Sequence, residues 1–404
     1  MSNSDSSGGG AAAAAAAAGQ RRAPRPRPPS ALRTLLNLPY FAAVVFLMYW
    51  SMPFCAALGY IPPWQLWGAR SDIFYWCKFF VDAFRIDARV IPRPIEGQQQ
   101  GQPKAGAAAN PAAGAPLHRP PGRPVIYLAN HRSWADFFLD AYLTAGRAQM
   151  LSRMAVLYAF PWFMLPITTA RGCVVFKRGA IADKDRFNAW LDSKIAASPA
   201  PGLVVYPEGH RSSAAHSLPL KRGMLHYAYG RKVPVQVVMS AGKERVLSER
   251  RRRAAWGGIV ATAYAAPVDP KDFDTSDGFM AAVQKSWDAA WEVAAPYALP
   301  ENRAALEALP KNPVGPEMFV WPPHLQAAQT AFSLASTVAM LATLWAWSRA
   351  ALWLTSASVL VPLRPLLAAL ALVWVMASFV ACRDDGSAED GSKAAAVVRE
   401  RKDA

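Results

Sequence analysis

The chain has 404 residues, 53% of them hydrophobic, which is enough for one substantial domain with apolar sequence left over for a membrane. Its 44 lysines and arginines outnumber 28 acidic residues, and the formal charge of +16 suits an anionic partner; without a zinc-finger or ribonucleoprotein pattern, a lipid surface is favoured and no nucleic acid is expected. The four cysteines are scattered, so the sequence predicts neither a metal site nor a redox dithiol.

Three segments precede the first buried strand pattern. Residues 1–30 run through serine, glycine, eight consecutive alanines and then arginine with proline, a composition that cannot bury a core, so we expect disorder. Residues 31–96 join a long apolar run, broken by two prolines, to an aromatic and charged segment from Asp72 to Ile86. This pairing predicts a helical hairpin embedded in a membrane or lying in its interface. Residues 97–123, rich in Gln, Gly, Ala and Pro, are expected to form a flexible low-complexity insertion.

Residues 124–323 show the alternation that is typical of an α/β domain. Short runs rich in β-branched residues, PVIYLA, GCVVF, GLVVYP, VPVQVVM and GIVATAYA, are separated by longer segments. Two of these segments read as helices that begin near Trp134 and Asp183. Strands separated by helices of this length predict a mostly parallel sheet flanked by helices.

Residues 324–382 are again apolar and predict two C-terminal transmembrane helices. The runs Ala327–Trp347 and Pro365–Cys382 each have about the length of one membrane crossing, at ~1.5 Å rise per residue. The stretch Ala350–Leu363 between them is too short to cross and is expected to lie in the interface. Residues 383–404 form a charged tail for which we expect disorder. Basic residues flank the outermost apolar runs, which predicts that both chain ends are cytoplasmic.

The first candidate site follows the PVIYLA strand directly. His131 and Asp136 lie at the carboxyl end of this strand, where ligands bind in open α/β sheets. A histidine can take a proton from a hydroxyl near neutral pH, and a carboxylate can fix its tautomer. Five residues of separation put the pair about 140° apart on a helix, so we expect His131 on the turn before the helix and Asp136 in its first turn. Alternatively, Asp136 is the far half of a capping box that begins at Ser133.

Two further strand ends carry charge. The segment from Gly172 ends in the cations Lys177 and Arg178, and Arg178 is suited to hold a phosphate, with a solvated strand end as the alternative. The loop 207–212 offers a glycine that lets the backbone approach a ligand, a carboxylate, a cation and a hydroxyl. A purely structural turn would also use its proline and glycine.

Four short motifs in this order resemble those of the glycerophospholipid acyltransferase family, which includes 1-acylglycerol-3-phosphate acyltransferases. The family motif Asn-His-x4-Asp resembles residues 130–136, and Gly-x-Ile/Val-Phe-Ile-x-Arg resembles residues 172–178. Phe-Pro-Glu-Gly-Thr-Arg-Ser resembles residues 206–212, and a hydrophobic strand around a proline resembles residues 233–235. The resemblance covers roughly residues 120–270.

Two departures from these motifs bear on the acceptor contacts. His210 stands where the family has threonine, and Val175 and Phe176 reverse the usual order of aromatic and branched residues. The departures weaken the transfer of acceptor contacts near these positions. His131 and Asp136 fit the family pattern fully.

The resemblance implies that His131 is the general base and Asp136 the acid that orients it. It implies direct transfer from acyl-CoA, a co-substrate, without a cofactor or metal; the sequence also lacks the Gly-x-Ser-x-Gly elbow of an acyl-enzyme. The residues expected to bind the acceptor are Gly172, Arg178, Glu208, Gly209, Arg211 and Ser212.

The predicted function is the esterification of the free hydroxyl of a lysophospholipid, with 1-acylglycerol-3-phosphate becoming phosphatidic acid. Other acceptors stay open, namely lysocardiolipin and lysophosphatidylinositol, as do a lipid hydrolase and a catalytically idle membrane scaffold. The expected partners are a lipid bilayer, acyl-CoA and the lysophospholipid. The expected location is the endoplasmic reticulum membrane with the site facing the cytosol, and a plastid envelope is the alternative because residues 1–30 also suit a transit peptide.

Overall fold

A computed structural model gives the fold of most of the chain. It describes residues 31–50, 69–92, 116–169, 171–177, 183–212, 217–312, 314–320, 322–356 and 361–382. The expectations for residues 1–30, for 97–115 of the insertion, for the tail 383–404 and for Arg178 lie outside the described residues.

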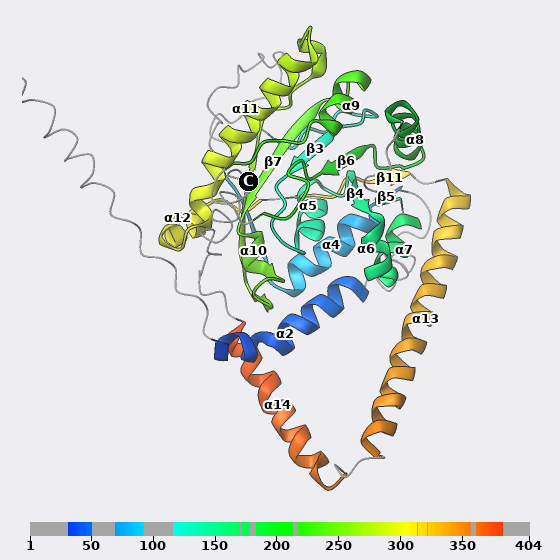
Figure 1. Cartoon of the computed structure of the whole chain (residues 1–404), viewed down its shortest axis with the longest axis vertical. Coiled ribbons are helices and arrows are strands. Elements are labelled where there is room, and N and C mark those ends of the chain that lie inside the picture. The colour runs from blue at the N-terminus through cyan, green and yellow to red at the C-terminus, as the bar shows by residue number, and fades with distance from the viewer. Residues whose placement is uncertain are drawn as a thin grey trace, which may run out of the picture.

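A seven-stranded sheet forms the centre of the molecule (Figure 1). Its spatial order is β2 (Asp87–Val90), β10 (Ile259–Tyr264), β7 (Val235–Ala241), β3 (Ile126–Ala129), β6 (Gly202–Val205), β4 (Ala148–Arg153) and β5 (Cys173–Phe176). Every neighbouring pair is parallel except β7 and β10, which run antiparallel. The prediction of a mostly parallel sheet is therefore confirmed. Two small antiparallel pairs lie outside it: β1 (Ala69–Arg70) with β11 (Phe319–Val320), and β8 (Leu247–Ser248) with β9 (Arg253–Ala254).

Helices cover both faces of the sheet because its central strands are apolar on both sides. In β3, Tyr127 and Ala129 belong to one core cluster, and Ile126 and Leu128 belong to the other. The first face carries α4 (Asp72–Ala83), α5 (Asp136–Leu143), α6 (Met154–Ala159) and α7 (Pro161–Thr169). The second carries α8 (Lys184–Ala196), α9 (Gly223–Arg231), α11 (Ser276–Ala294) and α12 (Arg303–Ala308). A single turn, α10 (Lys243–Val246), follows β7.

The segment predicted as a membrane hairpin instead contributes two elements to the α/β domain. Helix α4 is buried along one stripe, with Trp76 and Phe80 each 1% exposed, and packs on α5 through Phe138. Strand β2 pairs with β10 and forms an edge of the large sheet. The prediction that the α/β domain begins at residue 124 was therefore wrong. A helical apolar stripe fits lipid and a protein core equally well, and the sequence of β2, Asp-Ala-Arg-Val, carries no strand signal.

Three apolar helices lie on one side of the domain. They are α2 (Ala31–Trp50), α13 (Pro323–Ser356) and α14 (Arg364–Ala381). Figure 1 shows α13 and α14 leaving the domain and converging at a distant tip, with α2 between α14 and the domain. The indole Nε1 of Trp374 donates to the carbonyl oxygen of Leu35 at 2.9 Å and so joins α14 to α2.

Only the first of these helices meets the length and composition of a membrane span among the described residues. The segment Ala31–Tyr49 does so, and Pro365–Ala381 is apolar but shorter. The two predicted C-terminal spans are therefore not confirmed. In addition, α13 continues through Ser356, so part of the stretch expected to be a separate interfacial segment is the end of this helix.

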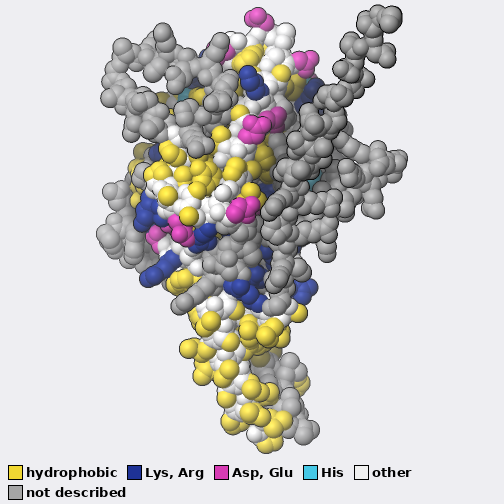
Figure 2. All heavy atoms as spheres, turned by 90° about the vertical axis from the view of Figure 1, so that its left-hand side faces the viewer, with side chains coloured by type: hydrophobic (Ala, Val, Ile, Leu, Met, Phe, Trp, Pro, Cys, Tyr) yellow, Lys and Arg dark blue, Asp and Glu magenta, His cyan; other side chains and the backbone are white. Residues whose placement is uncertain are grey.

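The projection formed by α13 and α14 nevertheless exposes an unusual amount of apolar surface. Figure 2 shows hydrophobic side chains covering it. The side chains concerned are at least half exposed and include Val338, Trp345, Trp353, Leu370, Val373 and Val380. Water-exposed protein surface rarely gathers large apolar side chains in this way.

Candidate active site

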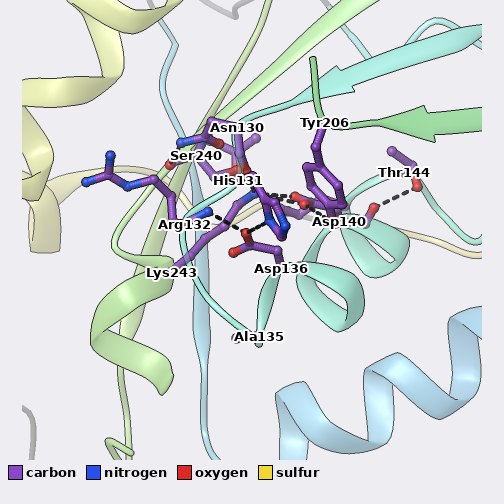
Figure 3. A network of polar contacts seen from close by, with 12 residues as sticks. Asn130, His131, Arg132, Ala135, Asp136, Asp140, Thr144, Tyr206, Ser240 and Lys243 are labelled. Atoms are coloured by element: carbon purple, nitrogen blue, oxygen red, sulfur yellow. Dashed lines mark hydrogen bonds and ion pairs between the residues drawn. The ribbon is translucent and has the colours of Figure 1, made fainter. Parts of the chain in front are cut away.

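The His131–Asp136 pair lies at the carboxyl edge of the sheet. His131 follows the end of β3 after one residue, and Asp136 is the first residue of α5. The His131 Nδ1 atom is 2.7 Å from Asp136 Oδ2. Figure 3 shows the two side chains pointing toward each other between the strand end and the helix start. The spacing argument thus predicted their placement correctly, with the histidine on the turn and the carboxylate in the first turn.

Asp136 also binds the backbone of the turn that precedes its helix. Its Oδ2 atom accepts hydrogen bonds from the backbone N–H groups of Arg132 and Ser133, the latter at 3.0 Å. The hydrogen bond back to Ser133, which the capping-box alternative predicts, and the contact with His131 are therefore both present and use the same oxygen. The Asp136 side chain is 1% exposed, whereas that of His131 is 25% exposed, so the imidazole reaches the surface and its partner does not.

Asp136 is held in its ionised form. Burial by itself would raise the pKa of this carboxyl, but the Lys243 ammonium and the hydrogen bonds from His131 and Ser133 outweigh burial, and its pKa lies below the ordinary value. A permanently negative Asp136 stabilises the positive charge that the imidazole acquires when it takes a proton.

A buried ion pair lies directly beneath the dyad. Lys243 Nζ is 2.6 Å from Asp140 Oδ1, and both side chains are 0% exposed. The same ammonium donates to the carbonyl oxygen of Asn130 at 2.9 Å. Burial raises the pKa of Asp140 to about 6, against the opposing effect of Lys243. Lys243, the first residue of α10, therefore connects the end of β3 to the second turn of α5 (Figure 3).

Tyr206 connects this ion pair to the histidine ring. Its ring stacks on the imidazole of His131, with centroids 4.2 Å apart and planes 15° from parallel. Its hydroxyl donates to Asp140 Oδ2 at 2.9 Å. The family motif has phenylalanine here, which keeps the stacking but cannot make the hydrogen bond.

Asn130 fixes the strand end that carries the histidine. Its side-chain amide donates to the carbonyl oxygen of Ser240 at 2.8 Å and accepts from the Ser240 N–H at 3.0 Å. These two bonds extend the pairing of β3 with β7 by one residue. The asparagine of the first motif thus has a structural role that fixes where the turn begins.

The loop 207–212 lies against the dyad turn. The Ser212 N–H donates to the His131 carbonyl oxygen at 2.8 Å. Gly209 has φ +74°, so this position favours glycine for its backbone conformation; a Cβ there would lie 2.6 Å from Lys221 Nζ, the end of a flexible side chain that can move away. The Gly209 carbonyl oxygen accepts from Arg153 at 2.7 Å.

Glu208 is a buried carboxyl beside the dyad. It is 3% exposed, and its Oε2 atom has no hydrogen-bond partner among the described residues. Burial raises its pKa to about 7, with Arg132 acting against the shift. A carboxyl with this pKa is partly protonated at neutral pH, so it can donate or accept a hydrogen bond.

Arg211, the expected acceptor-binding cation, is already paired. Its Nε is 2.8 Å from Glu249 Oε1, and its guanidinium lies 5.8 Å from the centre of the Trp134 ring. The other oxygen of Glu249 accepts from the Trp134 N–H at 3.2 Å. Glu249 thus joins the dyad turn to the loop 207–212, a connection that sequence reasoning missed.

Gly172 does not belong to this site. It precedes β5 and lies at the amino edge of the parallel sheet, whereas the dyad lies at the carboxyl edge. A Cβ at Gly172 would come 2.6 Å from Ile73 Cδ1, so the glycine allows close packing of β5 against α4. The prediction that Gly172 binds substrate was wrong, because a motif gives sequence order and not the edge of the sheet on which each residue lies.

Sequence reasoning also missed Lys243, although a usable signal was present. Lys243 comes two residues after β7, whose carboxyl end lies at the same edge as that of β3. The rule that pointed to His131 therefore applies equally to this lysine. Glu249 has no such signal because it lies on a hairpin outside the large sheet. Among the described residues, no group of three His, Cys, Asp or Glu side chains is placed to hold a metal.

Comparison with known proteins defines the class of this site. Residues 114–240 match the family model described as Acyltransferase. The human 1-acyl-sn-glycerol-3-phosphate acyltransferase alpha is 28% identical over 142 residues, which are 33% of this chain and 47% of that protein. The 1-acyl-sn-glycerol-3-phosphate acyltransferase of Cocos nucifera is 22% identical over 154 residues, 37% of this chain and 47% of that one.

One solved structure is also similar, the 1-acyl-sn-glycerophosphate acyltransferase of Thermotoga maritima. It has a TM-score of 0.44 and 18% identity, and the match covers 65% of this chain and 95% of that chain.

Residues 114–240 thus form a domain of the O-acyltransferase class. With the curated relatives, the match supports the resemblance to the glycerophospholipid acyltransferase family that the motifs indicated. The chain spans about half the length of the curated relatives it matches.

Proposed function

We propose that the chain is a membrane-bound acyltransferase that transfers the acyl group of acyl-CoA to the free hydroxyl of 1-acylglycerol-3-phosphate. The observation that carries this proposal is the dyad: a solvent-reaching imidazole held at 2.7 Å by a buried, ionised carboxylate. This arrangement suits a general base for a hydroxyl nucleophile.

The reaction needs one proton transfer to His131 and one proton transfer from it. His131 takes the proton of the acceptor hydroxyl through its Nε2 atom while the hydroxyl oxygen attacks the thioester carbonyl carbon. The new ester C–O bond forms, and the C–S bond breaks as the tetrahedral intermediate collapses. The proton then passes from the imidazolium to the leaving sulfur and yields CoA thiol. Asp136 stabilises the imidazolium between these two steps.

The acceptor phosphate needs cations near the dyad. Arg211 and Lys221 lie along or beside the loop 207–212, and Arg178 remains an expected ligand outside the described residues. Because Arg211 is shared with Glu249, a phosphate must compete with or rearrange this pair. Binding of the anion therefore replaces one charged partner by another, which favours an anionic acceptor over a neutral one.

The bilayer is the proposed source of the lysophospholipid acceptor. The support is the apolar length of α2 together with the apolar side chains exposed on α13 and α14. We propose the endoplasmic reticulum membrane as its location, with the dyad facing the cytosol, and keep the plastid envelope as the alternative.

A panel of acceptors tests the proposed function. Membranes from cells that express the chain are given labelled acyl-CoA with 1-acylglycerol-3-phosphate, lysocardiolipin, lysophosphatidylinositol or no acceptor. We expect labelled phosphatidic acid in excess over the other products. A preference for another lysolipid would change the acceptor, release of free fatty acid in all samples would indicate a hydrolase, and no product at all would indicate a scaffold.

A further inference from the structure

A hairpin outside the large sheet carries an uninterrupted run of arginines. Strands β8 and β9 pair antiparallel, with Leu247 opposite Ala254. The arginine run 250–253 begins in the turn between them and ends at the first residue of β9. We call residues 247–254 the arginine hairpin. Its side chains Arg250 and Arg252 are exposed. Like charges side by side repel one another, so such a run needs either a structural or a binding reason.

The arginine hairpin is fastened to α2, whose segment Ala31–Tyr49 is long and apolar enough to cross a membrane. The side-chain amide of Asn37 in α2 donates to the Ala254 carbonyl oxygen at 3.1 Å and accepts from the Ala254 N–H at 2.9 Å. Asn37 is 0% exposed, and a buried amide inside an apolar helix is costly unless it is bonded in this way. Just beyond the hairpin, the Trp256 N–H donates to the carbonyl oxygen of Cys382, which caps α14, at 2.9 Å.

The arginine hairpin is equally fastened to the active site. Its Glu249 bonds to the Trp134 N–H and to Arg211, and Arg250 donates to the Arg211 carbonyl oxygen at 3.1 Å. The hairpin therefore connects the apolar helices α2 and α14 to both segments that surround the dyad. Figure 1 shows the chain after α10 running down to α2.

The charge distribution indicates which partner fits this position. Figure 2 shows lysine and arginine side chains gathered where the apolar projection meets the domain. Apolar surface on one side and guanidinium groups at its border match a bilayer, in which the phosphate layer lies just outside the hydrocarbon. Guanidinium groups bind phosphate oxygens bidentately, and anionic lipids attract such clusters most strongly.

We propose that the arginine hairpin docks onto anionic phospholipid head groups of the membrane that holds α2 and α14. This goes beyond the proposed transfer reaction and rests on its membrane attachment alone. Docking fixes the height of Trp134 and Arg211 above the lipid phosphates, because Glu249 ties both to the hairpin. It also concentrates anionic lipid beside the dyad, including any acceptor that carries a phosphate.

Lipid proximity tests the proposal without relying on catalysis. The full chain carries Cys55→Ser and Trp256→Cys, so that a fluorophore next to the hairpin reports on lipid contact while the arginines are kept. The protein is reconstituted into phosphatidylcholine vesicles that contain spin-labelled phosphatidylserine or spin-labelled phosphatidylcholine. We expect stronger quenching by the anionic lipid, and a loss of this preference by about fivefold for each arginine removed in Arg250→Gln and Arg252→Gln. Raising the ionic strength should weaken it as well.

A matched control removes the same charge elsewhere. Lys271→Gln with Lys285→Gln neutralises two exposed lysines around α11 and should leave the preference unchanged. Equal quenching by the two lipids in the parent protein, or quenching by neither, overturns the proposal. Acyl transfer is measured on the same vesicles: transfer without lipid preference defeats only the hairpin proposal, and lipid preference without transfer defeats only the proposed function.

Discussion

At the scale of single residues, one oxygen of Asp136 holds both the turn before α5 and the imidazole of His131. Three donors converge on it, the His131 ring and two backbone N–H groups. Helix formation and orientation of the base are therefore a single local event. The dyad is thus already formed in the folded chain before any substrate binds, which lowers the cost of reaching the reactive geometry.

Asp136→Asn should separate charge from geometry. An asparagine oxygen can accept the same three hydrogen bonds, so we expect a folded protein with nearly unchanged KM. The imidazolium loses its negative partner, and kcat should fall about 10²- to 10⁴-fold. Steady-state kinetics with purified protein measure this. Asp277→Asn, an exposed acid in the first turn of α11, is the control and should leave kcat unchanged. A similar kcat for both variants would contradict the role of Asp136.

Glu208 should make stability depend on pH. Its pKa is raised from 4.5 to about 7, so the native chain holds this proton more tightly than the unfolded chain does. Its contribution to the free energy of unfolding is therefore favourable at low pH and declines as pH rises between these two values, by on the order of 3 kcal/mol. Glu208→Gln lacks this decline. Melting temperatures of both proteins across that pH range should diverge as pH rises, whereas parallel curves would contradict the buried state of Glu208.

At the scale of elements, the site depends on side chains that join the ends of neighbouring strands. Asn130 joins β3 to β7, Tyr206 joins the segment after β6 to α5, and Lys243 joins β3, α5 and α10. These polar contacts connect the strand ends at the carboxyl edge of the sheet to one another and surround the dyad. Loss of any one of these contacts is expected to displace the strand end or the helix that positions the dyad.

Lys243→Met should be strongly destabilising on its own. It leaves Asp140 buried without its cation, at a cost of about 3–5 kcal/mol. Adding Asp140→Asn removes the unpaired charge while keeping an acceptor for the Tyr206 hydroxyl, so the double variant should recover most of the lost stability. Thermal unfolding of both single variants and the double variant measures the coupling. Additive losses would show that the two side chains do not act as a pair.

Local pattern predicted the sheet and the dyad because both have local causes. The runs around Ile126 and Val204 are apolar on both faces, which specifies buried parallel strands, and the edge rule then locates His131. Strand β2 and Glu249 were missed because their places depend on contacts with residues far along the chain. Helix α4 was assigned to lipid because an aromatic stripe does not identify what covers it.

At the scale of the whole molecule, the apolar helices α2 and α14 are connected to the dyad turn through the basic arginine hairpin. Helices α2 and α14 are joined by the Trp374–Leu35 hydrogen bond, and the arginine hairpin lies between them and the site. If the proposed membrane attachment holds, such a connection lets the membrane surface determine where the dyad meets the proposed lipid acceptor. Membrane binding and catalysis are therefore expected to be coupled through Asn37 and Glu249.

Charges placed on α14 should weaken membrane attachment. Leu370 and Val373 are 57% and 65% exposed, so Leu370→Asp with Val373→Asp should leave the domain folded. Each aspartate costs about 3 kcal/mol near the centre of a membrane helix, so a larger fraction of the protein should be released by alkaline extraction. The control pair, Leu299→Asp with Met318→Asp, changes exposed apolar side chains away from α14. Equal release of the two variants would contradict a membrane role for the projection.

The most direct test of the central claim compares the wild-type chain with His131→Ala in one assay. Purified protein in vesicles receives labelled acyl-CoA and 1-acylglycerol-3-phosphate, and labelled phosphatidic acid is followed over time. His226→Ala, an exposed histidine on α9, is the matched control. We predict that His131→Ala forms the product at least about 10²-fold more slowly, while the control equals the wild type. Equal rates for all three proteins would contradict catalysis by the His131–Asp136 pair.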